Sequence, residues 1–260
     1  MEGCSIGDMT AIAVKMAQLG LGDEYWEDVD RYVRNCLIED QRTRPDQLKT
    51  LCRKLEESGQ AKEVPVEYTH LTDRFAERMV GSWSLHFLPN DLFGSTYFVT
   101  CCTGNCSRAL YYAWNSILDY TDGVLKVNLL LNRASPWADV DSYIPYIGRV
   151  DIKVKKPCKS VKIRMNNWIE KEKISCTVNS KGANLSWDGN YLVIGKVKPG
   201  RTITIAFPIH ERTEQLESFG YQYIAVFKGN DCVDLSPEGR YYPLFQRDQY
   251  RYNQPRFIKV

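Results

Sequence analysis

The chain has 260 residues, of which 43% are hydrophobic and 25% charged, and its formal net charge is +2. This composition is typical of a packed globular protein and excludes disorder as the default. The small net charge gives no indication of a nucleic acid or an anionic membrane as partner. No apolar run reaches the roughly 18 residues of a membrane helix, and the amino-terminal segment does not resemble a secretion signal, so we expect a cytoplasmic protein.

The first part of the chain has the period of amphipathic helices. Apolar side chains recur at every third or fourth position in residues 8–20, 23–37, 44–58, 69–80 and 107–118. Asp23 is the predicted N-cap of the second helix. Pro45 suits the first turn of the third helix, and Gly20 can end the first. The sequence therefore predicts a helical part at the start of the chain.

The apolar positions also predict which side of each helix is buried. In the first helix, the predicted face consists of Met9, Ile12, Ala13 and Met16. In the second, it consists of Trp26, Val29, Val33 and Leu37. In the fifth, it consists of Leu110, Ala113, Trp114 and Ile117. Such spacings place the members of each set on one stripe of a helix.

From Asp122 onward, the period changes to two. Short stretches rich in β-branched residues alternate between apolar and polar positions in residues 124–131, 149–155, 161–165, 173–179, 183–187, 190–197 and 201–208. Segments 187–190 and 198–201 are expected to form hairpin turns, and residues 220–237 add further strands. Short strands with regular turns favour an antiparallel β-sandwich of jelly-roll type.

Helices therefore precede strands along the chain, which favours separate α and β parts over a doubly wound sheet. No solenoid repeat or low-complexity linker interrupts this order. We expect a helical domain at residues 1–120, a β-sandwich at 121–208, and a second β region or carboxy-terminal extension at 209–260.

The chain contains nine cysteines. An odd number scattered over a chain of this length does not indicate a disulfide framework. Most of them occupy apolar positions, as Cys36, Cys52 and Cys176 do, and we interpret those as buried thiols. A reducing cytosol is the simplest compartment for such a chain.

Two of the cysteines are adjacent. Cys101 and Cys102 precede the fifth helix, where the partial positive charge of a helix N-terminus favours the thiolate. Glu2 and Cys4 stand just before the first helix. If the two helix N-termini meet, one carboxylate and three thiols could bind a zinc ion, which takes four such ligands. The alternative is that Cys4 and Cys106 are thiols of the hydrophobic core and that Cys101 and Cys102 only lie next to a turn.

Three segments carry a resemblance to a known family: "EGCSIGDMTAIAVKMA", "YWEDVDRYVRNCL" and "CCTGNCSRALYYAW". Together with the strands behind them, they resemble the later part of glycoside hydrolase family 127, the β-L-arabinofuranosidases and their relatives. The family's catalytic domain is an (α/α)6 barrel followed by β-sandwich domains. Its motifs are a Glu-x-Cys on one barrel helix and a Cys-Cys followed by a tight turn and Asn, which together bind one zinc ion. The resemblance implies that the helices of this chain are the later part of such a barrel.

The resemblance also implies a retaining glycosidase that acts on an arabinofuranoside-like carbohydrate. Cys101 would attack the anomeric carbon and form a thioglycosyl intermediate, while Glu2, Cys4 and Cys102 complete the zinc site. The family's general acid and its substrate-binding histidines precede the Glu-x-Cys motif, so they are expected upstream of this chain. An upstream chain or self-association would then complete the barrel, and the isolated chain would have little activity.

The chain departs from the family after the double cysteine. The family has Pro-Pro-Asn or a close variant there, whereas this chain has Thr-Gly-Asn, so only Asn105 matches. Arg108 stands where the family commonly has arginine, and His86 lies in a predicted loop that could reach the site. These three residues are the candidate substrate-binding residues.

Two other interpretations stay open. Sandwiches often bind glycans, and a fold alone does not fix a function, so the chain could be a non-catalytic carbohydrate-binding or structural module. The start at Met1, directly before Glu2, could also mark a truncated reading frame. Ligand binding that survives removal of residues 1–118 would favour the first interpretation, and a helical segment encoded just upstream would favour the second.

Overall fold

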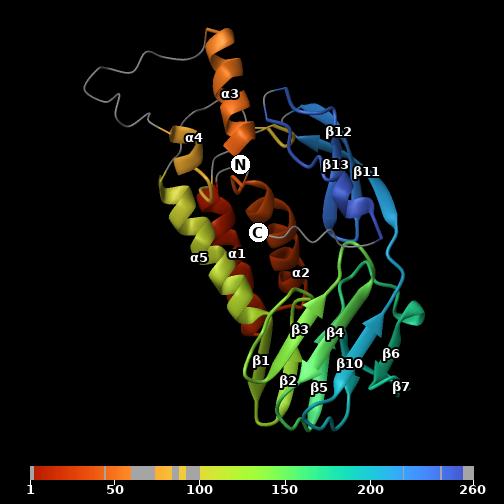
Figure 1. The fold of residues 1–260 in the computed structure, drawn as a ribbon. Coiled ribbons are helices and arrows are strands. Elements are labelled where there is room, and N and C mark those ends of the chain that lie inside the picture. Colours follow the sequence, from red (N-terminus) through yellow and green to blue (C-terminus); the bar gives the residue numbers. More distant parts are fainter. Residues whose placement is uncertain are drawn as a thin grey trace.

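The helices come first in the chain and lie together beside the β part (Figure 1). The structure is a computed structural model that describes residues 3–43, 45–59, 74–83, 88–91, 100–218, 220–240 and 242–253. The helices are α1 (Gly3–Gln18), α2 (Glu24–Arg31), the π-helical η1 (Tyr32–Leu37), α3 (Pro45–Glu57), α4 (Phe75–Arg78) and α5 (Thr100–Ser116). Over these described ranges, none of the helices combines the length and apolarity needed to cross a membrane.

Gly20 and Pro45 agree with the predicted helix ends, but α1 begins at Gly3 and α5 at Thr100, before the predicted starts at residues 8 and 107. Cys4, Cys101 and Cys102 therefore lie inside the helices that they were expected to precede. Gly20 follows the end of α1 with a φ of +72°, a left-handed conformation that glycine adopts without strain. Pro45 begins α3 as predicted. Asp23 occupies the N-cap position of α2 as predicted, but its backbone angles are helical and its side chain makes no cap hydrogen bond. Of the helix predicted at 69–80, α4 is the described part, and residues 69–73 lie outside the described residues.

Helices α1 and α5 pack side by side and run in parallel (Figure 1). Contacts at both ends join residues that are 98 positions apart, Cys4 with Cys102 and Gln18 with Ser116. A constant offset along both helices means that they run in the same direction and keep their register. Their N-termini therefore lie at the same end of the pair.

Small residues make up much of the contact between α1 and α5. The residues that α1 buries are Gly3, Ile6, Gly7, Thr10, Ala13, Val14 and Ala17. Those that α5 buries include Cys102, Cys106, Ala109, Ala113 and Ser116. Small side chains let the two backbones approach closely: a Cβ atom added at Gly7 would lie 3.0 Å from the carbonyl oxygen of Asn105.

The buried faces predicted for these two helices are therefore partly wrong. Met9 and Ile12 are 42% and 61% exposed, and Trp114 is 46% exposed, although Ala13 and Ala113 are buried as predicted. The prediction followed the largest apolar residues, whereas a closely packed helix pair selects small ones, because interiors leave no room for extra volume. The face predicted for the second helix is confirmed at all of its positions: Trp26, Val29, Val33 and Leu37.

Two five-stranded sheets follow the helices, in the orders β1-β2-β5-β9-β8 and β3-β4-β10-β6-β7. The first comprises β1 (Leu118–Thr121), β2 (Val124–Val127), β5 (Ser160–Arg164), β9 (Tyr191–Ile194) and β8 (Ser186–Asp188). The second comprises β3 (Ala138–Ser142), β4 (Arg149–Val154), β10 (Thr202–Ala206), β6 (Ser175–Val178) and β7 (Lys181–Gly182). Strands β2 and β5 are parallel, and the other neighbours are antiparallel. The expected order of helices before antiparallel-rich sheets is confirmed.

Alternate residues of both sheets enter one hydrophobic core. In β4, Val150, Ile152 and Val154 are fully buried, and the residues between them are not. The turn predicted at 187–190 is confirmed, since it joins the paired strands β8 and β9. The hairpin predicted at 198–201 is wrong, because β9 and β10 lie in different sheets and this turn crosses between them.

A third sheet lies beside the helices (Figure 1). It comprises β11 (Glu211–Ser218), β12 (Tyr221–Lys228) and β13 (Asp231–Ser236), all antiparallel. Two short 3-10 turns, η3 (Lys171–Lys173) and η4 (Asp248–Arg251), complete the described elements. The domain boundaries at residues 120 and 208 stay a prediction.

A buried polar junction joins the helices to both β regions. Its members are Glu27, Asp30 and Arg34 from α2 and η1, Arg164 and Asn166 at the end of β5, and Asn230 and Asp231 at the start of β13. Arg34 donates to Asp30 at 2.9 Å and to Asp231 at 3.1 Å. Arg164 donates to Glu27 at 2.6 Å. Opposite charges are thus paired inside the molecule, which is the condition for burying them.

Candidate metal centre

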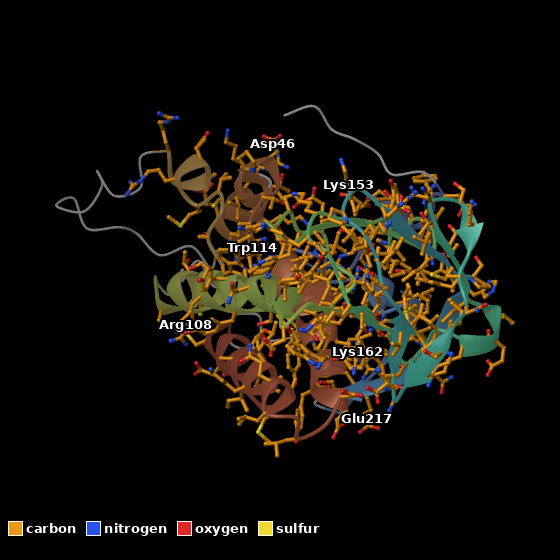
Figure 2. The ribbon with its side chains drawn as sticks, turned by 90° about the horizontal axis from the view of Figure 1, so that it is seen from below. Asp46, Arg108, Trp114, Lys153, Lys162 and Glu217 are labelled. Atoms are coloured by element: carbon orange, nitrogen blue, oxygen red, sulfur yellow. The ribbon has the colours of Figure 1, made fainter. Side chains whose placement is uncertain are left out.

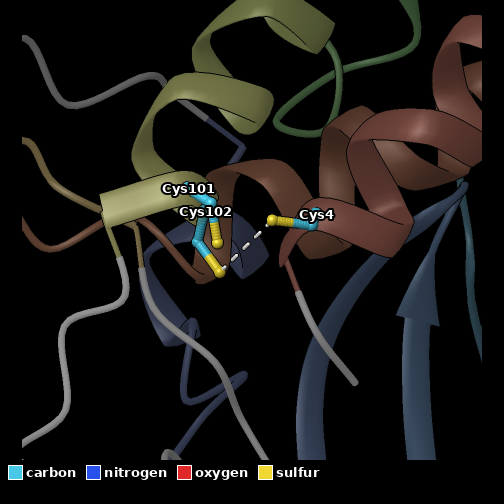
Figure 3. Close-up of side chains that lie close together, drawn as sticks. All are labelled: Cys4, Cys101 and Cys102. Atoms are coloured by element: carbon cyan, nitrogen blue, oxygen red, sulfur yellow. Dashed lines mark hydrogen bonds between the residues drawn. The ribbon is translucent and has the colours of Figure 1, made fainter.

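Three thiols from the first turns of α1 and α5 meet at one end of the helix pair. Cys4 lies in α1, and Cys101 and Cys102 lie in α5. Their Sγ atoms all lie within 4.8 Å of one another, and the Sγ atoms of Cys4 and Cys102 are 3.9 Å apart (Figure 3). The parallel packing of α1 and α5 therefore joins cysteines that are almost 100 positions apart.

The three thiols differ in their access to solvent. Cys102 is fully buried, Cys4 is half-buried, and Cys101 is exposed. A molecule that approaches from solvent therefore reaches the sulfur of Cys101 first. The thiols of Cys4 and Cys102 are less accessible to solvent.

The environment keeps two of these thiols neutral in the absence of a cation. Burial raises the pKa of Cys4 to about 12, the neighbouring thiols of Cys101 and Cys102 act in the same direction, and a hydrogen bond from Asn105 acts against them. Burial also raises the pKa of Cys102. A bound cation would reverse this balance, because it stabilises the thiolate form of each ligand.

The donor set and its spacing fit zinc. Zinc–thiolate bonds of about 2.3 Å in a tetrahedral site place two sulfurs roughly 3.8 Å apart. The separation between Cys4 and Cys102 is 3.9 Å. Thiolates are common ligands of zinc, above all in structural sites. Glu2, the predicted fourth ligand, lies outside the described residues.

A set of contacts around the thiols fixes the first turns of both helices. The side-chain amide of Asn105 donates to Cys4 Sγ at 3.1 Å. The thiol of Cys106 donates to the carbonyl of Gly3 at 3.2 Å. The backbone N–H of Trp83 donates to the hydroxyl of Thr103 at 3.2 Å. These contacts tie the first turns of α5 to α1 and to Trp83.

The candidate substrate-binding residues predicted from the sequence do not all form one group with the thiols in the part of the chain that the structure describes. Arg108 forms an exposed ion pair with Asp8 at 2.9 Å and lies on α5 away from the β part (Figure 2). His86 lies outside the described residues. The tight turn expected after the double cysteine does not form, because Thr103, Gly104 and Asn105 already belong to α5. The substrate-binding role of these residues stays a prediction.

The sequence did not predict a role for Gly7 in this arrangement, and it left Trp83 open between stacking against a sugar ring and ordinary packing. Gly7 permits the close approach of the helices. Trp83 is 5% exposed, and its indole N–H donates to the carbonyl of Leu37 at 2.7 Å. Gly7 gave a weak indication of close helix packing. A glycine inside a helix lowers the stability of that helix, and it is often found where another element packs closely against the backbone. No local pattern marks the partner of a buried tryptophan.

No family model and no curated protein matches the chain. Several solved structures have a similar fold. One is a family 127 β-L-arabinofuranosidase from Geobacillus stearothermophilus, with a TM-score of 0.53 and 15% identity. Two others are a family 127 β-arabinofuranosidase, with a TM-score of 0.59 and 16% identity, and a glycoside hydrolase, with a TM-score of 0.57 and 14% identity.

Each of these matches covers 89% of this chain, but only 36% or 37% of the other chain. The chain therefore spans little more than a third of the length of the structures it resembles. The resemblance predicted from the cysteine motifs is confirmed as a shared fold: helices followed by antiparallel-rich sheets, as in one part of family 127 glycoside hydrolases.

Proposed function

We propose that this chain carries part of the active site of a glycoside hydrolase resembling the family 127 β-L-arabinofuranosidases. The observation that carries the proposal is the convergence of the Sγ atoms of Cys4, Cys101 and Cys102 within 4.8 Å. The fold shared with three glycoside hydrolases supports the same assignment. The substrate class is then an arabinofuranoside-like carbohydrate.

In this proposal, the three cysteines hold a zinc ion and Glu2 supplies the fourth ligand. When bound, zinc supplies the positive charge that keeps the thiols deprotonated at neutral pH. Cys102, which is fully buried, and Cys4, which is half-buried, act only as ligands.

Cys101 is the proposed nucleophile because it is the exposed member of the cluster. Its sulfur attacks the anomeric carbon, so that a C–S bond forms as the glycosidic C–O bond breaks and the leaving oxygen takes a proton from a general acid. Water then displaces the sulfur, with the conjugate base of the same acid accepting a proton. Two successive inversions retain the configuration of the sugar.

We place the general acid in the part of such a fold that this chain does not match, since each match covers only 36% or 37% of the other chain. An exposed apolar side of α5 supports the idea that further helices complete the fold. Tyr111 and Trp114 are 57% and 46% exposed and line a groove of about 470 Å³ together with Val33, Leu110 and Ile117. Large exposed apolar patches usually mark interaction surfaces.

The test of the metal site is a zinc count on the reduced chain after dialysis against zinc. We expect one zinc per chain. Cys4→Ser, Cys101→Ser and Cys102→Ser should each weaken zinc binding by more than about tenfold, because each removes a ligand, and even the loss of a residue that only supports a ligand costs about tenfold in affinity. Cys52→Ser is the matched control, since Cys52 lies in α3 and outside the cluster. A wild-type chain without stoichiometric zinc would contradict the proposal.

The catalytic assignment is tested with an aryl β-L-arabinofuranoside. We expect little turnover by this chain alone, because the proton donor is placed elsewhere. Covalent labelling of Cys101 by an arabinofuranosyl electrophile, lost in Cys101→Ser and retained in Cys52→Ser, is the positive readout. If the chain alone turned over the substrate and Cys101→Ser abolished that activity, the result would support Cys101 as the nucleophile and contradict the placement of the general acid outside this chain.

A second candidate function is carbohydrate binding without hydrolysis. The observation that favours it is a cavity of about 300 Å³ between the carboxyl ends of α1 and α5 and the first sheet, lined by Trp26, Asp119, Lys126, Arg133 and Trp137, among others. Indole faces and charged groups of this kind can hold a sugar ring. Binding of arabinose-containing oligosaccharides that is lost in Trp137→Ala but kept in Cys101→Ser would favour this candidate.

A further inference from the structure

Asn105 connects the two helices at the proposed metal site. It lies in the second turn of α5, and its Nδ2 atom donates a hydrogen bond of 3.1 Å to Cys4 Sγ on α1. Its side chain is half-buried, so water competes for this contact only in part. The sequence suggested a substrate-binding role for Asn105, whereas its observed partner is a thiol.

The close approach at Gly7 makes this contact possible. A Cβ atom added at Gly7 would lie 3.0 Å from the carbonyl oxygen of Asn105 and 3.3 Å from its Cβ atom. A larger residue would therefore push this turn of α5 away from α1. The thiol of Cys106, one residue further along, donates to the carbonyl of Gly3 and holds the same two turns together.

A hydrogen bond to a thiolate changes the behaviour of that sulfur. It withdraws electron density, fixes the direction of the lone pairs, and keeps the sulfur in place as a ligand. It also lowers the nucleophilicity of that sulfur. An amide directed at Cys4 therefore makes Cys4 the more firmly held ligand and leaves the exposed Cys101 as the more reactive thiolate.

We propose that Asn105 is a positioning residue that makes the thiolates of the metal centre unequal, by donating a hydrogen bond to Cys4 so that Cys101 is the sulfur available for attack. This inference rests on the proposed function, because it assumes that the three thiols bind a metal. It assigns no contact with substrate to Asn105.

The experiment is a titration of the reduced, metal-free chain with Co²⁺, which replaces zinc and gives a sulfur-to-metal charge-transfer band. Asn105→Leu keeps the approximate shape of the side chain and removes the donor. We expect this variant to bind Co²⁺ about tenfold more weakly, with the band shifted to lower energy because Cys4 loses a hydrogen bond. Ser107→Ala is the control: Ser107 is exposed and bonds to the Gly104 carbonyl, so affinity and band should stay at wild-type values.

The outcomes separate the two proposals. A wild-type chain that gives no sulfur-to-cobalt band contradicts the proposed metal centre itself. A wild-type chain that binds cobalt normally, together with an Asn105→Leu variant of unchanged affinity and band, overturns the role of Asn105. If Asn105→Leu does not fold by circular dichroism, Gly7→Ala provides the second test, since it displaces the Asn105 turn without touching a sulfur. We expect the same shift of the band, and an unshifted band in that variant would overturn the inference.

Discussion

The polar junction and the cysteine cluster both gather polar side chains from distant parts of the chain, but they differ in charge balance. At the junction, the buried guanidiniums of Arg34 and Arg164 face the carboxylates of Asp30, Asp231 and Glu27. In the cluster, three thiols face one another. Pairs of opposite charge stabilise contacts between elements, whereas three converging thiols include no positive group, which a cation could supply. The comparison therefore separates a structural site from a proposed binding site.

The largest expected effect lies at the junction. Arg164→Met leaves the carboxylate of Glu27 buried without its ion-pair partner, although Asn230 still donates to it. We expect a loss of about 3–5 kcal/mol in the free energy of unfolding, measured by urea denaturation, because removing one partner of a buried ion pair leaves the other charge buried and uncompensated. The control Arg149→Met removes a more exposed pair with Asp151 and should cost less than about 1 kcal/mol. Equal losses in the two variants would mean that the junction does not have the stabilising role given to it here.

The next effect concerns the cluster. Zinc at a concentration 100 times its dissociation constant should stabilise the chain by about 2.7 kcal/mol, because the ion binds the folded form. Differential scanning calorimetry with zinc and then with a chelator measures this difference. The variant Cys102→Ser should lose half or more of the zinc-dependent stabilisation, because tenfold weaker binding leaves about 1.4 kcal/mol. A melting temperature that does not respond to zinc in the wild-type chain would show that the thiols do not form a binding site.

A smaller effect is expected at the contact between the two helices. Ala109→Leu inserts three carbon atoms into a fully buried position, and overpacking of this kind costs about 1–3 kcal/mol. Ile12→Ala removes a larger side chain that is 61% exposed and should change stability by less than about 0.5 kcal/mol. Urea denaturation of both variants checks this order. The reverse order would mean that α1 packs on the face predicted from its largest residues.

The smallest effect is a dependence on pH at the junction. Burial acts to raise the pKa of Glu27, but hydrogen bonds from Asn230 and Arg164 outweigh it, so the pKa of this carboxyl lies below its usual value. Its contribution to stability is therefore present above the unfolded pKa of about 4.3 and is lost as the pH falls through the folded pKa.

Comparison of the wild-type chain with Glu27→Gln between pH 6 and pH 3 measures this contribution. We expect the variant to be less stable at pH 6 and to lose less stability on acidification, with a difference in slope of at most about 1.4 kcal/mol per pH unit. The control is Ser107→Ala at an exposed position, which removes no titratable group and should keep the wild-type slope. An unchanged slope in Glu27→Gln would contradict the lowered pKa.

Local patterns predicted the kind of each element well. The alternation in β4 and the stripe from Trp26 to Leu37 both correspond to buried positions, whereas Ile12 and Trp114 are exposed although they fit the helical period. Local patterns did not predict which strands lie next to each other in a sheet. The segment 198–201 has the residues of a hairpin turn, but the strands on either side join different sheets, and only the packing of the whole core decides that.

The same limit applies to the candidate site. Chemistry indicated that Cys4 and the double cysteine could share a cation, and the structure brings their sulfurs together. The sequence did not indicate that Asn105 bonds to Cys4, nor that Gly7 lets α5 approach. Those contacts depend on the register between two helices that are almost 100 residues apart, which no local pattern encodes.

The most direct test of the metal centre is X-ray absorption at the zinc edge on the purified, zinc-loaded chain. We predict one zinc per chain with a shell of three sulfur atoms at about 2.3 Å and one lighter ligand. A zinc ion surrounded only by nitrogen and oxygen atoms, or a chain that retains no zinc, would contradict the account.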